Sequence, residues 1–251
     1  MHCRHTRFSR LDGADQGSQH PCYLPDPGLL SVSRHKVDHA MLSARNIQET
    51  LQHLANQRPI FHSEADFQHA LAWSVHKSYP NAVIRLELPF RTDNSSEYLD
   101  LQVTDGNQSF AVELKYKTRQ LVYQHAEEAF SLKQQGAQDL GRYDFLADVG
   151  RLERFVAAKR AISGCAILVT NDPSYWSKPA RPGTVDEMFR LNEGRVVHGS
   201  LAWLEHASAG TMRSREKPIT VTGNYTAAWK PYSAPSKLPG GEFRFLAWHV
   251  G

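Results

Sequence analysis

The sequence lacks several features that mark common classes of protein. No apolar run in its 251 residues approaches the roughly 18 residues that a membrane-spanning helix needs, and no hydrophobic signal-peptide core occurs near its start. It has no GxSxG elbow, no Walker loop, no GxGxxG motif and no internal repeat. These absences argue against a membrane protein and remove several enzyme classes that such motifs identify.

Cysteine is also scarce. Cys3, Cys22 and Cys165 are odd in number and widely spaced, which favours a reducing compartment over a disulfide framework. No CxxC or HxxxH pair near the N-terminus has the spacing of a zinc finger, so we expect no metal site there. The small number and wide spacing of the cysteines therefore predict a cytoplasmic protein.

The composition suits one sizeable core with appendages, because 41% of the residues are hydrophobic and 22% are charged. Residues 1–40 show no sustained periodicity and contain several Gly, Pro and Ser residues, so we predict a disordered leader. A helical pattern runs from Ala44 to Gln57, and Met41 before it is a candidate start of translation. We place the core domain at residues 41–172.

The chain changes character after the core. Short strand patterns among Gly and Pro turns predict that residues 173–251 form a β-rich extension packed on the core. Trp203, Trp229 and Trp248 lie in this extension. We expect them to pack as core aromatics, with stacking on unpaired bases as the alternative.

Two alternating segments on either side of a turn predict a β-hairpin at residues 98–116. Apolar residues take one face of both strands, and residues 104–107 supply the turn. The other face carries Asp100 on the first strand, and Glu113 and Lys115 on the second.

The register of the hairpin sets the distance between the two acids. If residues 105–106 form a two-residue loop, Asp100 lies opposite Ala111 and diagonal to Glu113. If residues 105–108 form a four-residue loop, Asp100 faces Glu113 directly. Cross-strand neighbours lie about 5 Å apart and diagonal ones about 7 Å, so in either register the two carboxylates could share one divalent cation.

These residue types are the parts of a metal-dependent phosphodiester-cleaving centre. Hard oxygen ligands hold Mg²⁺ with several waters retained, and a nearby ammonium orients a water or stabilises developing charge. Asp100, Glu113 and Lys115 provide these parts. The alternative is a solvated strand face whose acids form surface ion pairs with Lys115, each worth about 0–1 kcal/mol.

A helix is expected to open upstream of the hairpin. Ser63 has the N-cap position, and Asp66 stands in the acid position of a capping box. Glu64 lies three residues before Phe67 and so on the inward face of this helix. The alternative role for Glu64 is a favourable interaction with the helix N-terminus.

The order helix, strand, hairpin with D…ExK and helix resembles the core of the PD-(D/E)xK nuclease superfamily, the restriction-endonuclease-like fold. The resemblance covers roughly residues 60–171. It implies an α/β protein whose αβββαβ core contains a mixed sheet.

The resemblance also implies roles for individual residues. Asp100 and Glu113 would ligate Mg²⁺ or Mn²⁺ together with the backbone carbonyl of Leu114. Lys115 would position or activate water. Glu64 would be an auxiliary ligand or would orient a ligand.

The next segment, residues 135–146, leads into a helix whose apolar stripe continues to Val156. Some relatives place a Q-x3-Y motif here. This sequence has only Asp139-x3-Tyr143, so we assign no site role to this helix. Residues 165–170, CAILVT, predict a buried strand that completes the core.

The net charge is only +3 with histidine neutral, so the chain is no general polyanion binder. Its cations crowd the stretch around the expected site, where phosphate contacts would be needed. A solvated helix face is the alternative for the last five of them. These cations are Lys115, Lys117, Arg119, Lys133, Arg142, Arg151, Arg154, Lys159 and Arg160.

We therefore predict a metal-dependent nuclease that hydrolyses phosphodiester bonds. The expected partner is nucleic acid, with DNA favoured. We expect no association with a membrane, and the chain could form a homodimer. The alternative is a degenerate nuclease fold that binds nucleic acid or a protein partner without cutting. All the expected site residue types are present, which favours the enzyme.

Overall fold

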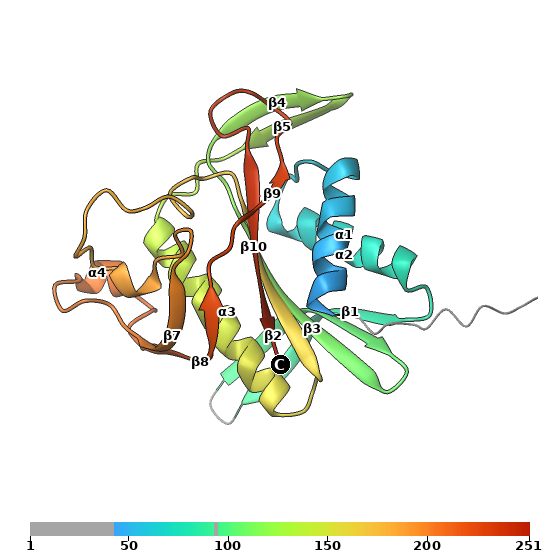
Figure 1. Cartoon of the computed structure of the whole chain (residues 1–251), viewed down its shortest axis with the longest axis horizontal. Helices are drawn as coiled ribbons and strands as arrows, with labels where there is room; N and C mark the ends of the chain where they lie inside the picture. The colour runs from blue at the N-terminus through green and yellow to red at the C-terminus, as the bar shows by residue number, and fades with distance from the viewer. Residues whose placement is uncertain (1–42, 93–94) are drawn as a thin grey trace, which may run out of the picture. The chain divides into compact units, whose positions relative to one another are not determined.

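A six-stranded mixed sheet with helices on both faces forms the centre of the protein (Figure 1). The structure, a computed structural model, describes residues 43–92 and 95–251, so the predicted leader and Met41 lie outside it. No helix in this part of the chain is long and apolar enough to cross a membrane. The predicted α/β class with a mixed sheet is confirmed.

The central sheet has the strand order β1-β2-β3-β6-β10-β9, and β4–β5 and β7–β8 form two separate hairpin-like pairs. Only β3 and β6 pair in parallel; the other neighbours in the described sheets are antiparallel. The elements are α1 Ala44–Gln57, α2 Glu64–Ser78, β1 Val83–Thr92, β2 Ser95–Asp105, β3 Gln108–Lys117, β4 Leu121–His125, β5 Glu128–Leu132, α3 Gln138–Ala157, β6 Ser163–Thr170, η1 Glu187–Phe189, β7 Val196–Leu201, α4 Ala209–Met212, β8 Ile219–Thr226, β9 Lys230–Ser233 and β10 Phe243–Val250.

Both predicted helix starts are confirmed. Helix α1 spans the predicted residues 44–57, and α2 begins after Ser63, whose hydroxyl accepts the N–H of Asp66. The reciprocal half of the capping box is absent, since the Asp66 carboxylate accepts from the N–H of His62 and pairs with Arg58. Asp66 therefore ties the segment before α2 to the helix.

Alternation along β3 separates two cores, one on each face of the sheet. The face covered by α1 and α2 buries Phe61, Phe67, Phe110, Tyr116 and Phe243, among others. The face covered by α3 and the β7–β8 region buries Phe145, Leu152, Phe189, Trp229 and Trp248. The apolar face predicted for the second strand of the hairpin is confirmed by the buried Phe110, Val112, Leu114 and Tyr116.

The C-terminal strands belong to the central sheet. Strand β10 pairs with β6 from Arg244 to Val250 and carries β9 on its other edge. Trp203, Trp229 and Trp248 are all buried, and each indole N–H donates to a backbone carbonyl. Their expected role in core packing is confirmed, which leaves their faces inaccessible to unpaired bases.

The parallel contact of β3 with β6 predicts a sensitive glycine. An ideal Cβ added to Gly164 would lie 2.7 Å from the carbonyl oxygen of Ala111 and 2.8 Å from Leu152. Gly164→Ala should therefore lower the free energy of unfolding by about 1–3 kcal/mol in urea titrations. Gly136→Ala is the control, because no atom lies within 4 Å of its added Cβ. Equal effects of the two substitutions would contradict this account of the β3–β6 contact.

Candidate active site

Strands β2 and β3 separate at the point where the predicted acids lie. They pair in the register of the longer predicted loop, with Leu101 opposite Val112, although the turn itself is only residues 106–107. The next facing pair in this register is Asp100 and Glu113, but the ladder ends at Leu101. The two strands thus part at the residues that carry the two acids, and Asp100 and Glu113 both lie at this fork.

Two carboxylates, those of Asp100 and Glu64, accept the backbone N–H groups that strand β3 presents at this fork. Beyond Val112, strand β3 no longer has β2 as a hydrogen-bonding neighbour on this edge. The N–H of Leu114 donates to Oδ2 of Asp100 at 2.6 Å, and the N–H of Tyr116 donates to Oε2 of Glu64 at 2.8 Å. Side chains from β2 and from the first residue of α2 therefore replace the missing strand, which brings Glu64 into the site.

Helix α3 closes the other side of the cluster with an acid and a guanidinium. Lys115 places its Nζ 2.6 Å from Oδ2 of Asp148 and 4.0 Å from Oε1 of Glu64. Arg151 binds both oxygens of Glu113, at 2.7 and 2.8 Å, and Oδ1 of Asp148 at 2.6 Å. The sequence analysis named Arg151 only as a candidate phosphate contact and did not identify Asp148, yet these two residues of α3 are two of the six charged groups that meet here.

The cluster runs from a buried end to an open end. Glu113 is 1% exposed and Asp148 is 5% exposed, whereas the Glu64 side chain is 44% exposed. A ligand can therefore approach from the side of α2. Counted with Asp100, four carboxylates face the two cations Lys115 and Arg151, so the fully ionised cluster has a formal charge of −2. The two buried acids are matched by the two cations, and the excess negative charge lies on Asp100 and Glu64 toward the open end.

The buried groups have shifted pKa values. Burial raises the pKa of Glu113, against the opposing effect of its bonds to Arg151. Burial also raises the pKa of Asp148, to about 6, while Lys115 and Arg151 act in the opposite direction. For Lys115, burial lowers the pKa, but Asp148 and Glu64 more than offset this, and the net shift is upward. Lys115 is therefore an ammonium at neutral pH, which makes it a hydrogen-bond donor and not a base.

The oxygen donors of the cluster fit Mg²⁺ in type and charge. Oδ2 of Asp148 is buried and has no well-aligned hydrogen bond, although Nζ of Lys115 is close. Mg²⁺ needs only one or two carboxylates, because it retains several waters. Within residues 43–92 and 95–251, however, no group of three or more His, Cys, Asp and Glu residues is arranged to hold a metal, and Arg151 holds both oxygens of Glu113.

Asp148 and two further polar residues were missed by the sequence analysis. Asp148 lies three residues before Arg151, beside the apolar stripe of α3, and that spacing was the available signal. Glu87 on β1 has a φ of 49° and lies where the β1–β2 register faces Asp100. Gln68 on α2 donates to both Glu87 and the carbonyl of Asp100. No local pattern marks Glu87, so only the fold could reveal it.

Four of the predicted phosphate-binding cations, Lys115 and three arginines, form salt bridges within the protein. Arg151 binds Glu113, Arg142 pairs with the buried Asp186, and Arg154 pairs with Glu97. Their first role is to hold elements together. The cations that remain near the site are those at the end of β3 and on the loop that comes after it.

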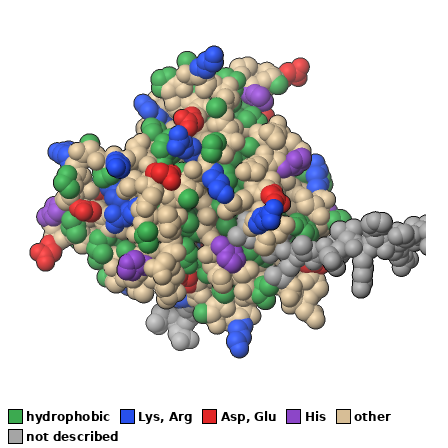
Figure 2. Space-filling view, in the orientation of Figure 1, with side chains coloured by type: hydrophobic (Ala, Val, Ile, Leu, Met, Phe, Trp, Pro, Cys, Tyr) green, Lys and Arg blue, Asp and Glu red, His purple; other side chains and the backbone are tan. Residues whose placement is uncertain are grey.

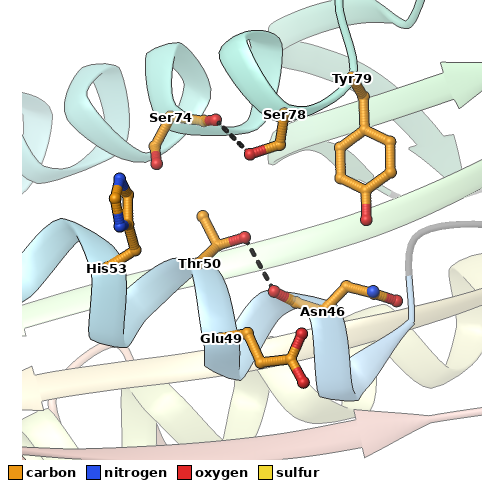
Figure 3. A pocket seen from close by; sticks show the side chains of 7 residues that line it. All are labelled: Asn46, Glu49, Thr50, His53, Ser74, Ser78 and Tyr79. Atoms are coloured by element: carbon orange, nitrogen blue, oxygen red, sulfur yellow. Dashed lines mark hydrogen bonds between the residues drawn. The ribbon is translucent and has the colours of Figure 1, made fainter.

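A separate polar pocket lies between α1 and α2 (Figure 3). Its volume is about 230 Å³, and it includes none of the charged residues of the cluster. The Thr50 and Ser78 hydroxyls donate to carbonyls of their own helices, at Asn46 and Ser74. These hydroxyl protons are therefore already used, and we assign this pocket no function.

Comparisons of the chain with protein-family models, with curated proteins and with solved structures find no match. A function for this protein therefore has to be argued from the geometry of the charged cluster at the strand fork. The resemblance over residues 60–171 stays a prediction.

The raised pKa of Asp148 predicts how stability depends on pH in metal-free buffer. Between about pH 4 and pH 6 the native state holds a proton on Asp148 that the unfolded chain has lost. The free energy of unfolding should therefore rise as the pH falls from 7 toward 5, by at most about 1.4 kcal/mol per pH unit from this group. Denaturant titrations should show a shallower dependence for Asp148→Asn, and the same slope as wild type would contradict the assignment.

Proposed function

We propose that this protein hydrolyses phosphodiester bonds in DNA in a reaction that depends on Mg²⁺ or Mn²⁺. The observation that carries the proposal is the convergence of Asp100, Glu113 and Lys115 at the fork between β2 and β3, with Glu64 on the open side. Acids, an ammonium and a backbone edge that has no strand neighbour meet there in one place. A surface strand would not need a buried Glu113, so the alternative of solvated ion pairs explains this arrangement poorly.

The order of elements supports membership of the PD-(D/E)xK superfamily. The chain runs α2, β1, β2, β3, α3 and β6, with β3 and β6 parallel and adjacent. This is the αβββαβ order that the resemblance implies. The β4–β5 hairpin is inserted between β3 and α3.

The metal would be held by Asp100, Glu113 and the carbonyl of Leu114. When bound, such a cation polarises a phosphate, lowers the pKa of a coordinated water and supplies the positive charge that the cluster lacks. Leu114 presents its N–H to Asp100 and its carbonyl oxygen to Nζ of Lys115 at 3.3 Å, so its peptide groups face the fork. Asp148 would hold Lys115 in position.

Lys115 would act as a donor in this reaction. Its raised pKa keeps the ammonium charged, so it can orient a water or stabilise charge that develops on a phosphate oxygen. Glu64, half-exposed and 4.0 Å from Lys115, would orient that ammonium from the open side.

One observation favours a second function, in which a protein with a nuclease fold binds nucleic acid or a protein partner without cutting. Arg151 already binds both oxygens of Glu113, and a guanidinium in this position can take the place of a metal. Metal entry then requires the Arg151 pair to open.

Cleavage assays distinguish these functions. Purified protein would be incubated with supercoiled plasmid, linear duplex, single-stranded DNA and RNA, each with Mg²⁺ and with EDTA. The proposal requires DNA cleavage that EDTA abolishes. If no substrate is cut and wild type binds no Mg²⁺ while Arg151→Met gains Mg²⁺ binding, the non-cutting function is correct.

Metal binding should stabilise the fold. A cation that binds only the native state raises the midpoint of thermal unfolding as its concentration rises, and Mg²⁺ or Mn²⁺ should do so at millimolar concentration. Asp100→Asn should abolish most of this shift, because the amide oxygen can still accept the N–H of Leu114 while the charge is lost. Glu97→Gln is the control, since Glu97 lies on the same strand but pairs with Arg154. Calorimetry that detects no Mg²⁺ binding to wild type would count against the enzyme.

Replacement of Lys115 by alanine and replacement of Lys117 by alanine should have different effects, the first on the rate of cleavage and the second on DNA binding. Lys115 contacts Asp148 inside the cluster, whereas Lys117 ends β3 opposite Thr170. Lys115→Ala should reduce the cleavage rate by about two orders of magnitude or more with DNA affinity nearly unchanged, because a transition-state interaction is lost. Lys117→Ala should mainly weaken binding and reduce its salt dependence by about one unit of slope.

The comparison needs a stability control, because Lys115→Ala leaves the buried Asp148 with one cation fewer. Lys115→Gln, which retains a donor, should show the same loss of rate if the charge matters. Small and equal effects of all three substitutions on cleavage would exclude the proposed site.

A further inference from the structure

A second charged site lies in the segment between β6 and β7. A cavity of about 350 Å³ opens there, and its lining includes Lys178, Arg181, Arg190 and Arg195 with the single acid Glu187. We call this the cationic pocket. It shares no residue with the carboxylate cluster at the strand fork, so a role for it does not depend on whether the protein cleaves DNA.

The positive charge of the cationic pocket is poorly compensated. Lys178, Arg181 and Arg195 form no salt bridge with any residue that the structure describes. Arg190 must share Asp186 with the buried Arg142. The four cations that line the cationic pocket and the neighbouring Arg142 make five, and they share the two carboxylates of Asp186 and Glu187.

The arginines also have donors without acceptors. Nε of Arg190 and Nε of Arg195 are buried, and neither has a hydrogen-bond partner in the described structure. Among the described residues, the only hydrogen-bond partner of the Arg195 guanidinium is the carbonyl of Met188, at a long 3.5 Å. Buried N–H groups are normally paired, so these arginines have capacity for an acceptor that the protein itself does not supply.

Nearby contacts hold the lining in place. Nη2 of Arg190 donates to Thr184 and Asp186 at 2.9 and 3.1 Å. Oε2 of Glu187 accepts the N–H of Gly183 at 2.6 Å, which directs part of its charge to the backbone. Burial, and then the neighbouring Arg142, lower the pKa of Arg190, which is consistent with an excess of positive charge around it.

Lysine and arginine side chains lie on the surface in the region of this segment, with acidic side chains among them (Figure 2). Figure 2 shows several of them on the left of the molecule, where Figure 1 draws the connection between β6 and the region of β7 and α4. The cationic pocket is thus open to a charged ligand from solvent, since Lys178 and Arg181 are exposed.

We propose that the cationic pocket binds a phosphate group. Phosphate offers several acceptor oxygens and up to two negative charges, and the fork of an arginine matches its geometry. The volume exceeds what a bare anion needs and falls at the lower end of small-ligand sites. The cationic pocket therefore has room for a further group attached to the phosphate, and the two sources that we test are a nucleic-acid strand and a free nucleotide.

Calorimetry on the full chain in EDTA tests this assignment, because chelation removes any contribution from a metal at the strand fork. The probes are inorganic phosphate, a nucleoside 5′-monophosphate and a short single-stranded oligonucleotide. Wild type should bind at least one of the two nucleotide probes with 1:1 stoichiometry and more tightly than inorganic phosphate. Preference for the oligonucleotide identifies a strand as the source, and preference for the monophosphate identifies a free nucleotide.

A pair of double variants separates a pocket from general attraction. Lys178→Ala with Arg181→Ala should weaken binding about tenfold or more, because charge-assisted contacts are lost. Arg213→Ala with Lys237→Ala makes the same change in net charge at exposed positions elsewhere, and it should leave binding unchanged. Arg195→Gln should also weaken binding. Equal weakening by the two double variants, or no binding of either nucleotide probe at millimolar concentration, would overturn the proposal.

Discussion

The carboxylates that cap the free edge of β3 are the constraint on which the rest of the site depends. Where β2 leaves, the N–H groups of Leu114 and Tyr116 need acceptors, because unpaired backbone donors at a buried edge are costly. Asp100 and Glu64 meet this need. The same two contacts join α2, β2 and β3 at one point, so the geometry that completes the sheet is also the geometry that gathers the charges.

Much of the fold can be inferred from local patterns in the sequence. The starts of α1 and α2, the β2–β3 hairpin and the strand at residues 165–170 are each specified within a dozen or so neighbouring residues, and each was predicted. The β4–β5 hairpin was not predicted, because five-residue strands with little burial have weak periodicity. The place of β10 beside β6 depends on contacts between distant segments, which no local pattern encodes.

The candidate site was predictable for the groups on β2, β3 and α2 and not for those on α3. Asp100, Glu113 and Lys115 were identified from alternation along two strands, although the register stayed open until pairing was known. Asp148 and Arg151 lie on a helix whose rotation over the sheet is set by its packing, so their sequence positions alone do not reveal that they reach Glu113 and Lys115. This matters for the proposed function, because Arg151 binds both oxygens of the carboxylate that would hold the metal.

The insertion of β10 between β6 and β9 has a consequence for synthesis of the chain. Strand β6 ends at Thr170, but its antiparallel neighbour is complete only at Val250. On the ribosome, the α2-to-β6 segment therefore emerges and can collapse while β6 still presents a bare hydrogen-bonding edge. That edge is a site for pairing with another nascent chain, so slow translation between β6 and β10 should favour aggregation, and a chaperone that covers β6 should favour folding.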